Sequence, residues 1–251
     1  MLEMSWSFFV IAAPAVVFAG ISKGGFGSGA AFAAATILAL VVEPGQALGI
    51  MLPLLMLVDV ATLRPYWGRW SWPDARVLML GGVPGVAIGA GFYSVANDDV
   101  IRLVIGAIAL GFVLWRVAQA KKLIRPYEHR LSQSAGLLAG MASGFTSFIS
   151  HAGGPPAAVY LLSQRLTKTE YQATTVILFW VINIAKFIPY AFLGMFTMQT
   201  ALADLVLAPF AILGAWLGVR AHMLVPERLF FGLTYVLLVC TGSKLIWDAL
   251  T

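Results

Sequence analysis

The sequence contains only one cysteine, Cys240, so no disulfide can form within the chain and no thiolate cluster can hold a metal ion. Charged residues are also scarce, since Asp, Glu, Lys and Arg make up only 11% of the 251 residues. The sequence has no phosphate-binding GxxxxGK motif, no metal-ligand spacing and no convincing catalytic triad. We therefore expect no enzyme activity, no cofactor and no metal.

Hydrophobic residues make up 60% of the chain, whereas a soluble domain has about 45–50% apolar residues. The net charge of +5 comes from Lys and Arg in short connections between apolar runs, which is typical of the cytoplasmic loops of a membrane protein and argues against a nucleic-acid partner. The segment from Met1 to Trp6 has an acid and no basic residue, unlike a cleavable signal peptide, so we expect the first helix to be retained. The composition predicts a multi-pass membrane protein embedded in a lipid bilayer.

A basic linker at 119–130 divides the chain into two similar halves, 1–118 and 131–251. Sliding one half on the other by 125 or 126 residues places Gly27 on Gly153 and Gly68 on Gly194. Apolar runs lie at about 6–22, 28–42, 45–63, 77–96, 100–118, 131–150, 155–163, 171–194, 202–219 and 229–250. The pattern predicts one transmembrane domain made of two repeats.

Loop charges predict that the two repeats are inverted relative to each other. Basic residues gather in the connections around 64–76, 119–130, 165–168 and 220–228, which we place in the cytoplasm. The loops around 43, 98–99 and 204 are poor in basic residues, so both termini are predicted to lie outside.

Each half begins with an apolar segment that is interrupted by glycine or proline. In the first half we expect half-helices over Phe8–Ser22 and Ser28–Val42, each too short to cross a core of about 30 Å. In the second half we expect helices over Leu131–Ser150 and Pro155–Leu162. The predicted fold is an all-α membrane protein of two inverted repeats, each a broken half-helix pair followed by three transmembrane helices.

The two breaks predict a binding site, because paired broken helices are the best sequence indication of where a transporter binds its substrate. A helix restarts after each break, so two helix N-termini with unpaired N–H groups would face an anion. The alternative is that the glycines only permit close helix packing. The candidate substrate-binding residues are Ser22, Lys23, Gly24, Gly25, Phe26, Gly27, Ser28, Ser150, His151, Ala152, Gly153, Gly154 and Pro155.

Ionisable residues inside apolar runs are costly and are expected to face the bundle interior. Lys23 is predicted either to meet an anionic substrate or to pair with Asp59. His151 could donate to an oxyanion or accept a coupling proton, or could be an ordinary buried histidine. Asp59, Asn183 and Lys186 are candidates for a structural network or for ion coupling.

The motifs Ser22-Lys23-Gly24-Gly25-Phe26-Gly27 and His151-Ala152-Gly153-Gly154-Pro155-Pro156 resemble those of the TauE/SafE sulfite exporter family, also called TSUP. The resemblance covers nearly the whole chain, although residues 30–35 lack the proline that many members have there. It implies a carrier in the inner membrane of a bacterium for sulfite, sulfoacetate or other organosulfonates. By position, the substrate region would fall on 22–28 and 150–156.

The leading hypothesis is a secondary transporter, of exporter type, that moves a small sulfur-containing anion by alternating access. An uncoupled anion channel, and a transporter of a small non-sulfur carboxylate, are the alternatives. The sequence leaves the coupling ion open between a proton and sodium, and also leaves open whether the chain forms a homodimer.

Overall fold

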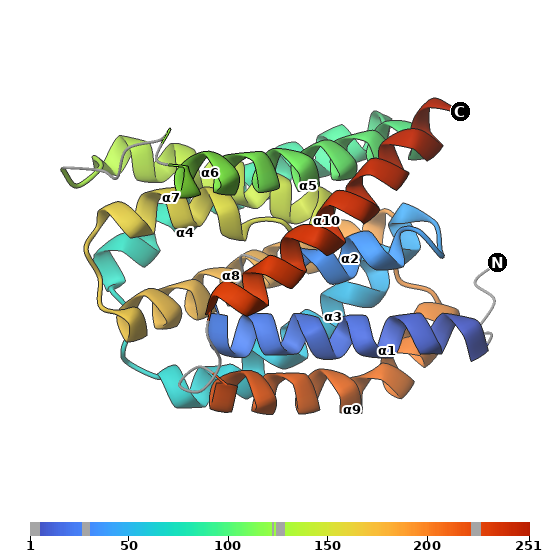
Figure 1. Ribbon diagram of the computed structural model, residues 1–251, viewed down its shortest axis with the longest axis horizontal. Coiled ribbons are helices and arrows are strands. Elements are labelled where there is room, and N and C mark those ends of the chain that lie inside the picture. The colour runs from blue at the N-terminus through green and yellow to red at the C-terminus, as the bar shows by residue number, and fades with distance from the viewer. Residues whose placement is uncertain (1–5, 27–30, 122, 124–128, 222–226) are drawn as a thin grey trace.

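The computed structural model describes residues 6–26, 31–121, 123, 129–221 and 227–251, which form helices and their connections without a strand. The elements are α1 (Trp6–Ile21), the π-helix η1 (Ser22–Phe26), α2 (Phe32–Leu38), α3 (Pro44–Tyr66), α4 (Trp72–Val95), α5 (Asp98–Ala120), α6 (Gln133–Ser150), α7 (Gly154–Ser163), α8 (Lys168–Phe192), α9 (Met198–Ala221) and α10 (Glu227–Leu250). Figure 1 shows a bundle in which the start of α1 and the end of α10 lie at the same end.

Seven helices among the described residues are long and apolar enough to cross a membrane, namely α1 with η1, α3, α4, α5, α8, α9 and α10. The apolar run predicted at 100–118 lies within α5, and the run at 229–250 lies within α10. Inside a bilayer no water can pair with the backbone, so a long apolar run forms a helix, in which the backbone groups hydrogen-bond to one another. The predicted all-α membrane fold is confirmed.

The second break has the predicted structure. The helix α6 ends at Ser150, and α7 begins at Gly154 with Pro155 in its first turn. Proline is suited to this place because the first N–H groups of a helix have no partner within the helix. His151, between the two helices, adopts the left-handed conformation with φ 55°, which is uncommon outside glycine and fixes the reversal of the chain.

The first break differs from the prediction, because the chain does not leave the helix at the glycines. It continues from α1 into η1, so Trp6–Phe26 is one span of 21 residues rather than a half-helix ending at Ser22. The glycines lack a Cβ, and this lets α9 approach closely. A Cβ on Gly24 would lie 2.7 Å from the Ala215 carbonyl oxygen. The partner helix α2 has seven residues, much shorter than the predicted Ser28–Val42.

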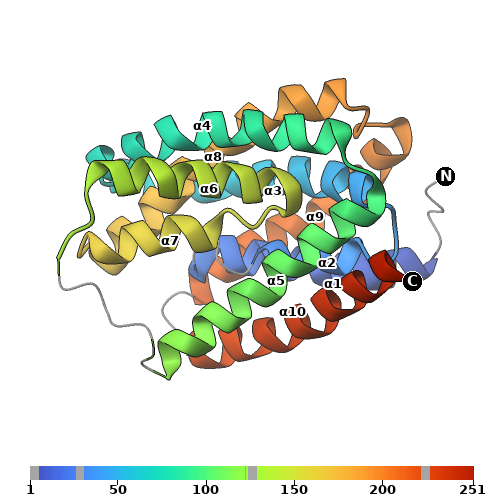
Figure 2. The same cartoon turned by 90° about the horizontal axis from the view of Figure 1, so that it is seen from above.

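Each main contact between two helices has a counterpart when the helices of one half are matched to those of the other. If α1, α3, α4 and α5 correspond to α6, α8, α9 and α10, the contact of α4 with α6 corresponds to that of α9 with α1. The contacts of α5 with α10 and of α3 with α8 map onto themselves, and Figure 2 shows α5 and α10 side by side. Gly68 and Gly194, which follow α3 and α8, have φ values of +72° and +71°. These correspondences support the predicted duplication, while the inversion and the boundaries at 118 and 131 stay predictions.

Glycines at four-residue spacing on α4 and α9 lie at contacts between helices. A Cβ on Gly85 of α4 would lie 2.9 Å from the carbonyl carbon of Met141 on α6. A Cβ on Gly218 of α9 would lie 2.5 Å from the carbonyl oxygen of Ile21 on α1. Small residues therefore bring these helix backbones together, as is usual inside membranes.

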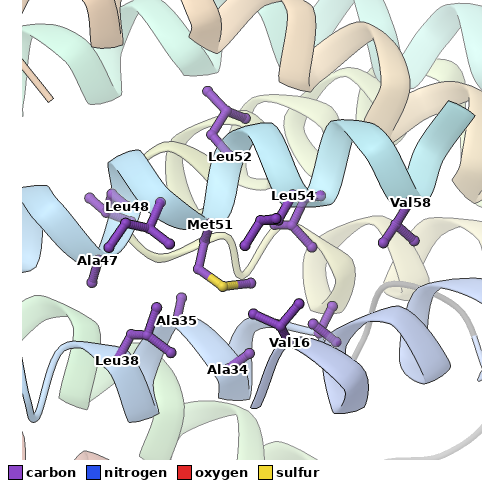
Figure 3. Packing of buried hydrophobic residues seen from close by; sticks show 14 of the residues in the cluster. Val16, Ala34, Ala35, Leu38, Ala47, Leu48, Met51, Leu52, Leu54 and Val58 are labelled. Atoms are coloured by element: carbon purple, nitrogen blue, oxygen red, sulfur yellow. The ribbon is translucent and has the colours of Figure 1, made fainter. Parts of the chain in front are cut away.

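The largest apolar cluster packs α3 against α1 and α2. Figure 3 shows Met51 and Leu54 of α3 facing Ala34 and Ala35 of α2 and Val16 of α1. This apolar packing holds α3 beside both breaks and places its one acidic side chain, Asp59, inside the bundle.

Candidate functional site

Five polar side chains are buried in the middle of the bundle, and we call them the central cluster. They are Lys23, Asp59, His151, Asn183 and Lys186. Each has 6% or less of its surface exposed, although the surrounding residues are largely apolar. Placing ionisable groups there costs free energy unless each is paired, so the partners of each group indicate its role.

Lys23 and Asp59 form the first pair. The Lys23 ammonium lies 2.5 Å from Asp59 Oδ1 and also donates to the Leu55 carbonyl at 3.4 Å. The Asn183 amide donates to the other carboxylate oxygen, Oδ2, at 2.6 Å. Sequence reasoning offered pairing with Asp59 as the alternative to substrate contact for Lys23, and the structure brings these two residues together.

His151 and Lys186 form the second pair, which contains no carboxylate. The Lys186 ammonium donates to His151 Nδ1 at 2.8 Å, and to the Ser147 carbonyl and hydroxyl oxygens at 3.0 and 3.1 Å. His151 Nε2 lies 3.3 Å from the Leu48 carbonyl oxygen. A carbonyl only accepts and an ammonium only donates, so the network assigns the single ring proton to Nε2. The imidazole is therefore neutral in this arrangement.

The two pairs occupy similar places in the two halves. Lys186 follows His151 by 35 residues, and Asp59 follows Lys23 at nearly the same spacing. In each pair one residue lies at a break and the other lies on the long helix that follows, α3 or α8. The similarity of position makes the difference in charge informative.

A second set of contacts repeats between the halves. The Tyr66 hydroxyl near the end of α3 donates to the Gly24 carbonyl, 42 residues earlier, at 3.0 Å. The Tyr190 hydroxyl near the end of α8 donates to the Phe148 carbonyl, also 42 residues earlier, at 2.5 Å. Each tyrosine thus ties a long helix to the backbone beside a break. Sequence reasoning missed both, because Tyr190 lies 124 residues after Tyr66, outside the offset of 125 or 126 residues that aligns the two halves.

The charges of the central cluster do not balance. Among the described residues, the fully buried charged side chains are Lys23, Lys186 and Asp59. Asp59 neutralises Lys23 by direct contact, whereas no described carboxylate lies within ion-pair distance of Lys186. With all three groups ionised, the interior holds one more positive than negative charge.

The other predicted site residues have mainly structural contacts. Gln172 donates to the Lys23 carbonyl at 2.7 Å, Ser150 donates to the Thr146 carbonyl, and the Gly153 carbonyl accepts from Ser143 at 2.6 Å. Ser22, Gly24, Gly25, Ala152 and Gly154 are buried, and Phe26 and Pro155 line a cavity. Gly27 and Ser28 lie outside the described residues, so the predicted approach of Gly27 to Gly153 also lies outside them. Within the described ranges, no group of three His, Cys, Asp or Glu side chains is placed to hold a metal.

The chain matches the protein family described as Sulfite exporter TauE/SafE over residues 12–245. Comparisons with curated proteins and with solved structures found no match. Because the family match covers nearly the whole chain, this protein belongs to the TauE/SafE family. It is a multi-pass membrane protein of a transporter family, with the fold and the buried charge cluster described above.

Proposed function

We propose that this TauE/SafE protein is a secondary transporter that carries a small sulfur-containing anion, sulfite or an organosulfonate such as sulfoacetate, past the central cluster. The observation that carries the proposal is the burial of Lys186 with no described carboxylate within ion-pair distance. An ammonium inside a membrane protein needs a counter-charge or a purpose. A transported anion supplies the counter-charge when it binds.

The anion would bind beside Lys186 and His151 rather than beside Lys23. The Lys23 ammonium already has a carboxylate at 2.5 Å, so an anion there would compete with Asp59. Lys186 has only neutral acceptors, and a charged acceptor makes a stronger hydrogen bond than a neutral one. The incoming anion would replace one of these neutral acceptors, most simply the Ser147 hydroxyl.

The second break would contribute to the same site. The helix α7 begins at Gly154, and the N-terminus of a helix carries a partial positive charge and N–H groups without partners. Ser150 to Pro155 would thus add to the attraction that Lys186 exerts on an anion. In the first half, Ser22 to Phe26 would form the wall against which α9 packs.

Proton coupling would follow from the same contacts. His151 Nδ1 accepts a hydrogen bond from Lys186 in this state, so it has no room for a proton of its own. When an anion draws the ammonium away, Nδ1 is released and can accept a proton. Anion and proton would then cross together as the two halves move to expose the site on either side.

Transport by the reconstituted protein tests the proposal. Lys186→Met should lower sulfite flux about a hundredfold, because a charge-assisted contact and its orientation are both lost. The matched control is Lys244→Met, since Lys244 is an exposed lysine that pairs with Asp248 on α10. Full sulfite flux through Lys186→Met, or flux of equal size with and without a proton gradient, would contradict the proposed carrier.

A further inference from the structure

The connection between α3 and α4 carries three arginines that have no ionic partner among the described residues. Arg64 lies in the last turn of α3, Arg69 lies in the connection, and Arg76 lies in the second turn of α4. All three residues are exposed, and no described carboxylate lies within ion-pair distance of any of them. Both helices are candidate membrane spans, so the three arginines lie at one end of these spans.

The one acidic residue of the stretch 64–76 is already engaged by neutral donors. Asp74 Oδ2 accepts a hydrogen bond from the Ser71 hydroxyl at 2.5 Å, and Asp74 Oδ1 accepts one from the Tyr160 hydroxyl of α7 at 3.1 Å. The stretch thus has three positive charges and one negative charge. An excess of charge of one sign attracts ions of the opposite sign, so this surface is suited to an anionic partner.

Two exposed tryptophans lie beside the arginines in this stretch. Trp67 and Trp72 have 68% and 48% of their surface exposed. The Arg76 guanidinium lies over the Trp72 ring, 5.8 Å from its centre, and Trp67 packs edge to face against Trp70 with ring centres 5.5 Å apart. Indole rings favour the level of the lipid headgroups, because they have an apolar face and a polar N–H. The rings and the arginines together are suited to a phospholipid.

The connection is held in a fixed position against α8. The Ser71 N–H donates to the Thr174 hydroxyl of α8 at 2.9 Å. Trp70 packs against a small apolar cluster that contains Tyr66 of α3 and Val176 of α8. A surface that is ordered before binding loses less conformational entropy when its partner arrives. This order favours a defined binding site over a diffuse attraction.

The corresponding connection of the second half shows that the turn does not need the arginines. The two connections, 67–71 and 193–197, have the same length, and Gly68 and Gly194 have φ values of +72° and +71°. At an offset of 126 residues the three arginines fall on uncharged residues, Tyr190, Met195 and Leu202. The same turn therefore forms without them, and the arginines are available to a partner outside the chain.

We propose that Arg64, Trp67, Arg69, Trp72 and Arg76, which we call the arginine patch, bind the headgroup of an anionic phospholipid. The guanidinium groups donate to the phosphate oxygens, whose geometry suits them, and the two exposed rings lie at the level of the glycerol. The connection belongs to the face that the loop charges predict to be cytoplasmic, and anionic lipids are found in the cytoplasmic leaflet. The arginine patch would thus bind a lipid of the surrounding membrane, whichever anion the protein carries.

Lipid binding to the purified protein in an uncharged detergent tests this proposal. The probes are phosphatidylglycerol and phosphatidylcholine, each with a fluorescent label on one acyl chain, and anisotropy gives the two Kd values. Wild type should bind phosphatidylglycerol about tenfold more tightly, because both lipids have a phosphate but only phosphatidylglycerol has a net charge. The triple variant Arg64→Gln, Arg69→Gln, Arg76→Gln should bind both lipids equally, with each exposed arginine contributing about twofold. Trp67→Ala should weaken both lipids by a similar factor of about two.

The controls separate this site from general charge and from the transport site. Arg102→Gln changes an arginine that already pairs with Asp99, so it should bind both lipids as wild type does. Lys186→Met should also keep the preference for phosphatidylglycerol, because Lys186 is buried in the bundle. If the triple variant does not fold, raising the salt from about 0.1 to about 1 M should remove the preference in wild type, since the Debye length falls from about 10 to about 3 Å.

Three outcomes would overturn the arginine patch even if sulfite flux depends on Lys186. The first is equal affinity of wild type for the two lipids. The second is a tenfold preference for phosphatidylglycerol that persists in the triple variant. The third is displacement of phosphatidylglycerol by millimolar inorganic phosphate, which would mean that the arginines bind a free phosphate ion rather than a lipid.

Discussion

The two residue pairs beside the breaks lie at similar positions in the two halves but differ in net charge. Lys23 and Asp59 form an ion pair that neutralises itself, whereas Lys186 has a neutral histidine and a serine as its partners. The packing around each pair is similar, including a tyrosine that ties α3 or α8 to the break. The comparison suggests a division of roles, in which the first pair stabilises the fold and the second pair is left to attract an anion.

Breaking the first pair should give the largest effect. Asp59→Asn leaves Lys23 buried without a counter-charge, and removing one partner of a buried ion pair costs about 3–5 kcal/mol. Equilibrium unfolding in detergent measures this loss. The double variant Lys23→Met with Asp59→Asn should recover most of the stability, because no isolated charge remains. A double variant as unstable as Asp59→Asn would mean that the ion pair is not what stabilises this region.

Removing the charge of the second pair should act in the other direction on stability. Lys186→Met eliminates a buried ammonium without leaving an unpaired carboxylate, so the unfolding free energy should stay the same or rise by about 1 kcal/mol. The same detergent unfolding experiment checks this result. A loss of several kcal/mol would show that Lys186 has a stabilising partner and that the two pairs do not differ as described.

His151→Gln should slow sulfite transport about tenfold while leaving the fold intact. The glutamine side chain can accept a hydrogen bond from Lys186 or donate one to the Leu48 carbonyl, but it does not titrate. Proton transfer at this position is therefore lost. The pH dependence of sulfite flux in proteoliposomes is the informative measurement, because the variant should lose the dependence on a proton gradient. Lys244→Met, which changes an exposed lysine far from the second pair in the chain, serves as the control. Gradient-driven flux that survives in His151→Gln would exclude the coupling role.

The tyrosine contacts should give the smallest and most equal effects. Tyr66→Phe and Tyr190→Phe each remove one hydroxyl that donates to a carbonyl beside a break, so each should cost about 1 kcal/mol in unfolding free energy. Sulfite affinity should change in neither variant. Effects that differ by more than about 2 kcal/mol would weaken the view that the two halves share one scaffold.

The sequence was informative about the helices and the second break, because both are local. Apolar length located the spans, and Pro155 after two glycines located the start of α7. It was wrong about the first break, because the glycines at 24 and 25 look the same whether they open the helix or admit a neighbour. Only the packing of α9 decides between the two.

The pairing of the ionisable residues was predicted only in part, since each pair joins a break to a helix about 35 residues later. Pairing of Lys23 with Asp59 was one of two alternatives, and pairing of His151 with Lys186 was not predicted. Lys23 was predicted to meet either an anionic substrate or Asp59, and its ammonium pairs with Asp59. The cavity lined by Phe26 and Pro155 was also missed, because its lining comes from five separate elements.

Binding of an anion beside Lys186 is the central feature of the proposed function. The direct measurement is the rise in unfolding temperature that sulfite produces, since a ligand that binds the native state stabilises it in proportion to the logarithm of its excess over Kd. Wild type and the neutral double variant of Lys23 and Asp59 should both be stabilised by sulfite, and Lys186→Met should not. Stabilisation that persists in Lys186→Met and is lost in the double variant would contradict the account.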